Sequence, residues 1–355
     1  MNGQSGSDIR GSDGMTEAGS SGAPTLSVWE IRPFDMDVEW VARIDADVAW
    51  LGAQAANFVP VACPACGVAD PSPHYVKNGV RHVVCNACAT QYVSPRAPEA
   101  MMTEFYRRSK NYEYWSDTIY AASEAPRREK IFKPRLTHLL GLLEQRGVPM
   151  PTLIEVGAGY GVMCDEAVRS GRFGRVIGIE PTPKLAAVCR SRGLEVIEQG
   201  YEQVDFDGMA DAIVAYEVME HLFSPEKFVA WARRALKPGG LLILTCPGIE
   251  GFDIVSQGEL SPAVDHQHIN LFTDRGIRIL LQRFGFKCVE TDTPGKLDAE
   301  IAAEGIRNGK YDAVAVGSFL ASVLATADSR TLGLFQKFLV AARRSSHLRV
   351  VAHAP

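Results

Sequence analysis

The chain has 355 residues, of which 46% are hydrophobic and 22% charged, which excludes a disordered or fibrous protein and is typical of one large domain with a smaller one. The 37 basic and 42 acidic residues give a net charge of -5, so no general attraction to nucleic acids or anionic membranes is expected. No apolar stretch reaches the roughly 18 residues of a membrane span, and there is no signal-peptide core. With only eight cysteines, we expect a cytoplasmic protein rather than a disulfide-built secreted one.

Changes in composition divide the chain into regions. The first residues are rich in Gly, Ser and Asp and carry too little apolar surface to fold. The predicted regions are a disordered tail (1–25), an N-terminal region (26–100) with a cysteine-bearing module (63–95), a helical linker or lid (101–150), and a main domain (151–355) with a helical insertion (295–345).

Four short apolar runs predict buried strands in the main domain. They are residues 152–156, 175–180, 212–216 and 241–245. Continuous rather than alternating apolar runs indicate burial on both faces of a parallel sheet. The segment 225–236 between the last two runs has the spacing of an amphipathic helix. We therefore predict an α/β fold with a doubly wound, Rossmann-like sheet.

A glycine-rich turn follows the first of these strands. Gly157, Gly159 and Gly161 would let the chain bend sharply and let a ligand approach the backbone. Glu180 ends the next strand, where its carboxylate could accept both hydroxyls of a ribose. The pair indicates an adenosine-type cofactor, and the alternative is a tight turn without a ligand. The spacing differs from the Gly-x-Gly-x-x-Gly of dinucleotide folds, so a nicotinamide dehydrogenase is the weaker reading.

The segment 155–161 resembles the first motif of class I S-adenosylmethionine-dependent methyltransferases. Four further segments resemble later motifs of that family and occur in the same order. They are 179–180, 211–222 with its Glu-His-Leu ending, 236–245 and 348–352. The resemblance implies the methyltransferase sheet with an antiparallel last strand, S-adenosyl-L-methionine as the cofactor, and methyl transfer as the reaction.

The same resemblance implies a role for matching residues. The glycines would pass close to the amino-acid part of the cofactor, Glu180 would bind the ribose, Tyr201 would flank the adenine, and Glu217 would lie near the methionine moiety. The implied cofactor-binding residues are Glu155, Gly157, Ala158, Gly159, Gly161, Glu180, Pro181, Tyr201, Glu202 and Glu217.

Two CxxC pairs lie in the cysteine-bearing module. Cys63 and Cys66 are separated from Cys85 and Cys88 by a spacing typical of a four-thiolate zinc ribbon. Four protein ligands leave no open position, so the predicted zinc is structural rather than catalytic. The alternative is four unrelated thiols. The other cysteines, Cys164, Cys189, Cys246 and Cys288, are expected to be small buried hydrophobic residues.

A cluster of acid–base residues follows the fourth of these strands. Asp265, His266 and His268 are candidates to remove a proton from the methyl acceptor, and His221 lies on the same rim after the third strand. The alternatives are a hydrogen-bonded brace for the loop and a packing role for His221.

A cysteine module before a methyltransferase sheet resembles a narrower group, the zinc-ribbon methyltransferases of glycan and natural-product pathways, including enzymes that C-methylate nucleotide-linked sugars. In them a Glu-His pair supplies the base, and the corresponding positions here are Asp265 and His266. The group also implies a tyrosine entering the site, for which Tyr112 is the leading candidate, with Tyr106 and Tyr114 available. The alternative for these aromatic residues is packing.

These observations predict a methyltransferase that acts on a small polar metabolite, of the nucleotide-linked sugar or natural-product type. One alternative is an RNA methyltransferase that holds RNA with its zinc ribbon, although residues 63–95 contain only Lys77 and Arg81 as fixed positive charges. Another is a catalytically inactive cofactor-binding partner subunit. We expect no membrane partner, and nothing in the sequence indicates an oligomeric state.

Overall fold

The computed structural model describes residues 26–31, 37–148 and 151–355. The predicted disordered tail (1–25) and the last residues of the predicted helical linker lie outside the described residues. Within those ranges, no helix is both long enough and apolar enough for a membrane crossing.

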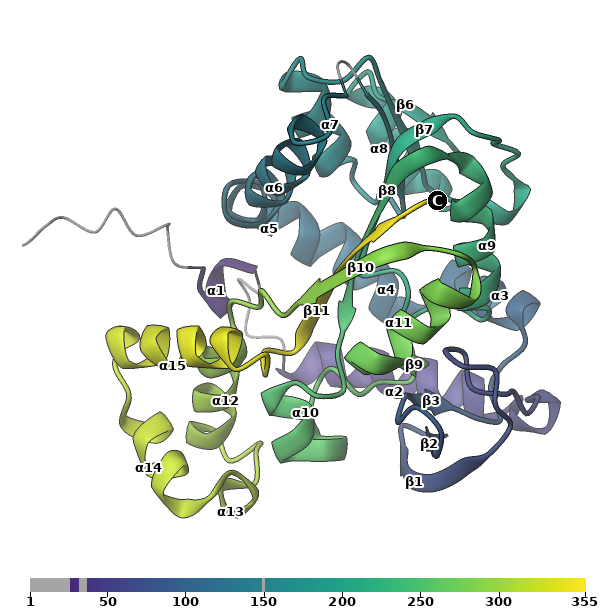
Figure 1. The fold of residues 1–355 in the computed structure, drawn as a ribbon. Coiled ribbons are helices and arrows are strands. Elements are labelled where there is room, and N and C mark those ends of the chain that lie inside the picture. Colours follow the sequence, from purple (N-terminus) through teal and green to yellow (C-terminus); the bar gives the residue numbers. More distant parts are fainter. Residues whose placement is uncertain (1–25, 32–36, 149–150) are drawn as a thin grey trace, which may run out of the picture.

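The main domain is built on a seven-stranded sheet with the order β10-β11-β8-β7-β4-β5-β6 (Figure 1). Strands β4 to β8 are parallel, and β11 runs antiparallel to both of its neighbours. The strands are β4 (Thr152–Val156), β5 (Arg175–Ile179), β6 (Glu195–Ile197), β7 (Ala210–Tyr216), β8 (Leu236–Pro247), β10 (Lys287–Asp292) and β11 (His347–His353). The predicted doubly wound α/β fold is confirmed.

Both faces of this sheet are covered because alternate residues of each buried strand point to opposite sides. Leu153 packs with the helices α6 (Lys133–Glu144), α7 (Val162–Arg169) and α8 (Pro183–Ser191). Ile154 packs with α9 (Pro225–Ala235) and α11 (Asp274–Arg283) on the other face. Apolar residues at every position of a strand are therefore the signature of this double cover.

One boundary differs from the prediction. Helix α9 ends at Ala235, and β8 begins already at Leu236, because Leu236 pairs with Ala210 of β7. The strand is longer than its apolar run, although residues 237–240 have no register partners in β7, where the register shifts between Ala210 and Ala212.

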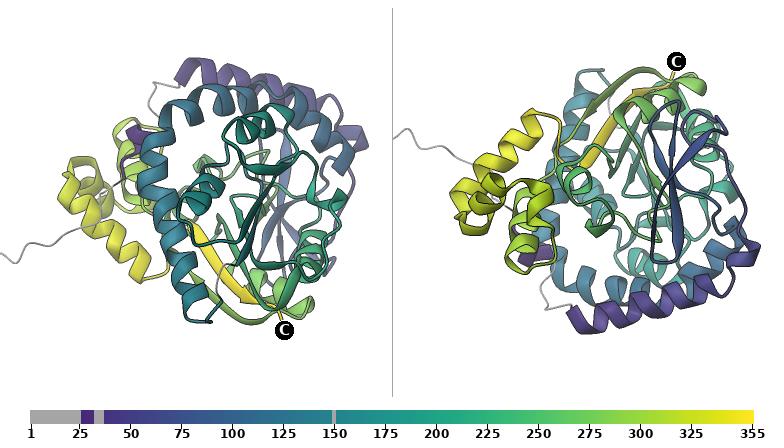
Figure 2. Two further views of the ribbon diagram at one scale, coloured as in Figure 1. Left: turned by 90° about the horizontal axis from the view of Figure 1, so that it is seen from above. Right: turned by 90° about the horizontal axis from the view of Figure 1, so that it is seen from below.

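Helices wrap around one side of the sheet as an arc (Figure 2). They are α2 (Asp37–Gly52), α3 (Glu99–Arg108), α4 (Lys110–Tyr114), α5 (Ala121–Arg127) and α6, with π-helical turns at Trp115–Tyr120 and Arg128–Phe132, and a short helix α1 (Val28–Ile31) precedes them. We call residues 99–144 the cover segment.

The cysteine-bearing module does not stand apart from the main domain. Its strands β1 (Pro71–Lys77), β2 (Val80–Cys85) and β3 (Gln91–Val93) form a four-stranded antiparallel sheet with β9 (Asn270–Leu271), which lies between β8 and β11 in the chain. Three of its cysteines belong to the same apolar core as β4, β7 and α11. The module is therefore a brace for the loop that leads into β9.

The segment before the last strand is helical and projects on the side opposite the cysteine-bearing module (Figure 1). It contains α12 (Asp298–Arg307), α13 (Ala313–Val316), α14 (Ser318–Thr326) and α15 (Ser329–Ala341). Asp298, which is 5% exposed, accepts hydrogen bonds from the Ser346 N–H (2.6 Å) and the Ser345 hydroxyl (2.5 Å). This carboxylate ties the start of the insertion to the start of β11.

Candidate functional site

The glycine turn lies between β4 and α7, at the point where the strand order reverses. Gly157, Gly159 and Gly161 all have positive φ, at 75°, 54° and 71°. A Cβ on Gly161 would lie 2.6 Å from Leu194, so this glycine is needed for packing. A Cβ on Gly159 would meet nothing within 4 Å, so space for a ligand is open there. The crevice at such a switch point is where doubly wound sheets bind ligands.

Glu180 follows β5 and holds the turn through its carboxylate. It is 4% exposed, and its two oxygens accept the backbone N–H groups of Gly159 (2.8 Å) and Thr182 (2.9 Å). Each oxygen keeps a further lone pair for a donor from a ligand. Burial raises the pKa of Glu180. The structure thus places Glu180, for which a ribose-binding role is predicted, in contact with Gly159 of the turn.

Glu155 lies in β4 beneath the turn. It is 3% exposed, and its Oε2 accepts hydrogen bonds from the Cys164 N–H (3.2 Å) and Sγ (3.0 Å) at the start of α7. Burial raises the pKa of Glu155 to about 7. Its contacts orient α7 relative to the turn.

This burial predicts a pH effect on stability. We expect the free energy of unfolding of the cofactor-free protein to fall by about 3 kcal/mol as the pH rises from 4.5 to 7. In that window the folded protein still binds the proton that the unfolded chain has released. Glu155→Gln, which stays neutral, should remove this contribution. Denaturant titrations of both proteins across the window measure it, and equal pH slopes would contradict it.

The other predicted cofactor residues have different surroundings. Ala158 is buried behind the turn, and Pro181 is exposed beside Glu180. The ring of Tyr201 is 6% exposed and packs against Phe228, with ring centroids 5.2 Å apart, so it is a core residue under α9. Glu202 is exposed.

Glu217 follows β7 with a φ of 57° and faces several partners. Its Oε1 accepts hydrogen bonds from the Thr245 hydroxyl (2.6 Å) and the Arg135 guanidinium (3.1 Å), and His347 lies 3.5 Å from its Oε2. Burial opposes ionisation, but the positive charges of His347 and Arg135 hold the pKa of Glu217 below its usual value. Sequence reasoning missed Arg135 and His347, because neither lies in a motif of the main sheet.

His221 and His268 meet across two loops. Their ring centroids are 4.9 Å apart, and Nδ1 of His221 lies 3.1 Å from the Tyr106 hydroxyl. Burial, followed by the charge of His268, lowers the pKa of His221 to about 3. His221 is therefore neutral near pH 7.

Asp265 and His266 form a close ion pair beside this cluster, and the backbone N–H of His266 donates to the same carboxylate. Nδ1 of His266 lies against Oδ1 of Asp265, and the ring of His266, 1% exposed, packs edge-on against Phe105 of α3 at 5.7 Å. Burial opposes ionisation of Asp265, but the neighbouring His266 holds the pKa of Asp265 below its usual range. Asn78, at the tip of the β1–β2 hairpin, donates to the same carboxylate at 3.3 Å.

Tyr112 connects the two halves of the site. Its ring packs edge-on against Tyr106 at 5.6 Å, and burial, with a further contribution from the charge of Glu180, raises the pKa of Tyr112. Tyr106 also lies 3.1 Å from Nδ1 of His221, so the two tyrosines lie beside the histidine cluster. The third tyrosine considered, Tyr114, instead stacks under Arg43 of α2 at 4.5 Å.

Ion pairs hold the cover segment over the rim of the sheet. Arg128 contacts Asp165 and Glu166 of α7, each at 2.5 Å, and Arg192 after α8 contacts Glu124 at 2.6 Å. These pairs are partly buried and are not simple surface contacts.

The four cysteines gather at one point of the cysteine-bearing module. The Sγ atoms of Cys63 and Cys88, and those of Cys66 and Cys85, are 3.5 Å apart, and all four lie within 4.8 Å of one another. A tetrahedral zinc ion with Zn–S bonds of about 2.3 Å needs sulfur atoms about 3.8 Å apart. The observed set therefore fits such an ion.

Cys164, Cys189 and Cys246 are buried as predicted, and the side chain of Cys288 lies outside the described part of the chain.

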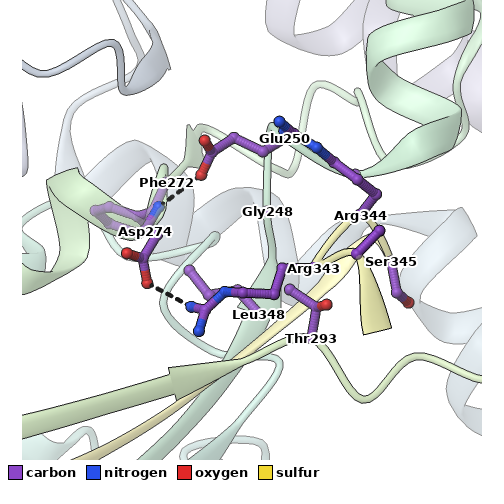
Figure 3. Close-up of a pocket in the computed structure, with 11 residues that line it drawn as sticks. Gly248, Glu250, Phe272, Asp274, Thr293, Arg343, Arg344, Ser345 and Leu348 are labelled. Atoms are coloured by element: carbon purple, nitrogen blue, oxygen red, sulfur yellow. Dashed lines mark hydrogen bonds and ion pairs between the residues drawn. The ribbon is translucent and has the colours of Figure 1, made fainter. Parts of the chain in front are cut away.

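A cavity of about 270 Å³ lies between the end of β8 and the end of the helical insertion (Figure 3). Two of its charged side chains, Arg343 and Asp274, form an ion pair. Arg343 donates to Asp274 at 3.1 Å, and the Asp274 N–H donates to Glu250 at 2.9 Å (Figure 3). None of the predicted site residues lines it, so the cavity does not mark the cofactor edge.

Comparison with known proteins identifies a methyltransferase domain. Residues 107–291, just over half of the chain, match the protein family described as Methyltransferase domain. An uncharacterized protein of Methanocaldococcus jannaschii is 23% identical over 220 residues, which cover 60% of this chain and 98% of that protein. A ubiquinone biosynthesis O-methyltransferase of Maricaulis maris is 34% identical over 113 residues, which cover 29% of this chain and 43% of that enzyme.

The chain thus spans less than half the length of that O-methyltransferase. Among solved structures, a phosphoethanolamine N-methyltransferase 2 of Haemonchus contortus in complex with S-adenosyl-L-methionine matches with a TM-score of 0.47 and 17% identity, covering 75% of this chain and 62% of that chain.

Proposed function

The chain belongs to the methyltransferase-domain family and is an S-adenosylmethionine-dependent methyltransferase, and from this premise we propose that its acceptor is a small polar metabolite of the nucleotide-linked sugar or natural-product type. The observation that carries the cofactor site is the pairing of the Glu180 carboxylate with the N–H of Gly159 at 2.8 Å, beside open space at that glycine. The proposed cofactor residues are those of the turn, together with Glu155 beneath the turn and Glu217 at the end of the neighbouring strand β7.

The small size of the acceptor is supported by the cover over the acid–base residues. His266 is 1% exposed and packs against Phe105, and Tyr106 and Tyr112 of the same cover segment line the way to Glu180. A folded RNA would need an open surface with many positive charges leading to the acid–base residues. The cysteine-bearing module supplies only Lys77 and Arg81 as fixed positive charges. Residues that follow β4, β5 and β7 instead contact the cover segment, since Tyr160 donates to the Ser116 carbonyl, Lys184 pairs with Asp117, and Glu217 pairs with Arg135.

When bound, S-adenosyl-L-methionine supplies a methyl group on a positive sulfonium, open to in-line attack. Asp265 holds Nδ1 of His266, which leaves Nε2 of His266, without a hydrogen-bond partner among the described residues, to take the acceptor's proton. Tyr112 is proposed to position the acceptor between this histidine and the turn. The cover segment excludes water.

A structural zinc ion held by Cys63, Cys66, Cys85 and Cys88 completes the proposal. It would fix the sheet that braces the loop of Asp265 and His266. Thiols kept free in the core, among them Cys164 and Cys246, suit the reducing cytoplasm that we propose as the location.

The proposal is tested with methyl-labelled cofactor and three acceptor pools: nucleotide-linked sugars, small hydroxylated aromatics, and total RNA. We expect label in a small molecule and a loss of kcat of about 100-fold or more for His266→Asn, with cofactor affinity unchanged. His74→Asn, at an exposed histidine, is the control and should match the wild type. Label in RNA alone would favour the RNA alternative. Cofactor binding without labelling of any pool would favour an inactive partner subunit.

A further inference from the structure

Glu220, His221 and His268 form a second cluster of possible metal ligands, separate from the four cysteines. One donor atom from each residue lies within 4.8 Å of the others, and Nε2 of His221 is 3.9 Å from Oε1 of Glu220. Two of the residues follow β7 and the third precedes β9, so only the fold brings them together. We propose that these three residues bind one divalent transition-metal ion beside the methyl acceptor.

The hydrogen bonds of the two histidines leave the required nitrogen free. Nδ1 of His221 lies 3.0 Å from the carbonyl oxygen of Gln267, and Nδ1 of His268 lies 2.8 Å from that of Ala263. A carbonyl oxygen can only accept, so each Nδ1 carries the hydrogen and each Nε2 presents a lone pair. Metal-binding histidines in proteins are held in this way, with the far ring nitrogen donating to a backbone carbonyl.

Glu220 supplies the second observation. It is 1% exposed, and its Oε2 has no hydrogen-bond partner among the described residues. A buried carboxylate oxygen without a partner is unfavourable, and a cation at this place would satisfy it. Glu217 lies near enough for its charge to act on Glu220, and its own oxygens are held by Thr245 and Arg135. Burial and then the charge of Glu217 raise the pKa of Glu220, and a cation bound here would favour its ionised form.

The donor set indicates which ions fit. Two imidazole nitrogens and one carboxylate, without a thiolate, favour Mn²⁺, Fe²⁺ or Zn²⁺ over Mg²⁺ or Ca²⁺. Three protein ligands leave coordination positions open, unlike the four-thiolate site.

The position of the site gives it a role that rests on the proposed function. His268 lies two residues after His266, so a cation here would lower the pKa of an acceptor hydroxyl close to the base. The hydroxyl oxygen would then form a bond to the methyl carbon, its proton would pass to His266, and the carbon–sulfur bond would break with its electron pair left on sulfur. The metal site therefore favours an oxygen acceptor.

The test uses Mn²⁺ as the probe on the full-length protein with its cysteine site already loaded with zinc, because Mn²⁺ prefers nitrogen and oxygen ligands over thiolates. Loss of the free Mn²⁺ signal in electron paramagnetic resonance reports binding without cofactor or acceptor. We expect one ion per chain for the wild type and for the control His74→Ala. Binding should be at least about 10-fold weaker for Glu220→Gln and for His268→Ala.

The outcomes separate this site from the proposed function. No Mn²⁺ binding by the wild type, or equal binding by all four proteins, would overturn the metal site, even if methyl transfer occurs. Calorimetry with S-adenosylhomocysteine on Glu220→Gln and His268→Ala checks that each variant is folded and still holds its cofactor. Mn²⁺ binding with no methyl transfer would support the metal site and count against the proposed function only.

Discussion

Replacement of Glu180 by alanine is expected to weaken binding of S-adenosylhomocysteine by at least about 100-fold. The carboxylate holds the Gly159 N–H at 2.8 Å and the Thr182 N–H at 2.9 Å, and each oxygen keeps a lone pair that could accept a ligand hydroxyl. Hydrogen bonds to a charged group contribute about 1.5–3 kcal/mol each, so the loss of two ligand hydroxyl contacts amounts to about 3 kcal/mol or more. Isothermal titration calorimetry measures the change.

Glu195→Ala is the matched control for this variant. Glu195 lies on the neighbouring strand β6, is exposed, and pairs with Arg175 at 2.5 Å on the surface. A surface ion pair of this kind contributes little. We expect wild-type affinity for Glu195→Ala, and wild-type affinity for Glu180→Ala would refute the assigned ribose-binding edge.

Cys85→Ser is expected to abolish binding of the proposed zinc ion and to lower methyl transfer by about 100-fold or more, with a much smaller change in cofactor affinity. The reason is the brace between the cysteine-bearing module and the loop before β9. Lys77 donates to the Ser261 carbonyl at 2.8 Å, Asn78 donates to Asp265 at 3.3 Å, and Tyr92 of β3 pairs with Asn270 of β9. Without the metal the hairpin loses its anchor, and Asp265 and His266 lose their position.

Elemental analysis and steady-state kinetics check this result. Cys246→Ser is the control, because Cys246 is fully buried in β8 but lies outside the four-cysteine cluster, so this variant should keep its zinc. A zinc-free Cys85→Ser protein with full activity would show that the module does not support the acid–base loop.

The sheet could be predicted because its strands are buried on both faces. Val156, Ile177 and Val214 sit in mainly apolar runs, and the structure places all four predicted runs in adjacent parallel strands. The apolar composition of such a run indicates burial on both faces, regardless of which residues the strand contacts. The glycine turn was equally visible, since only glycine adopts positive φ readily at three positions of one loop.

The surroundings of the acid–base residues could not be predicted in the same way. Tyr106 and Arg135 lie in amphipathic helices, where an aromatic or a basic residue has the same pattern whether it faces a site or the solvent. Tyr201 shows the converse, because a position suited to flanking adenine is filled by a ring that packs against Phe228.

The doubly wound sheet, the turn at 157–161 with Glu180 near it, and the four-cysteine spacing can be read from the amino-acid sequence, because each depends on residues close together in the chain or on the burial of a whole strand. The three-dimensional fold was needed to show that the cysteine-bearing module shares a sheet with β9, and that Glu220 and His221 meet His268. Those contacts join segments tens of residues apart, and they arise from how the loops beyond β7 and β8 pack against the module, which no local pattern encodes.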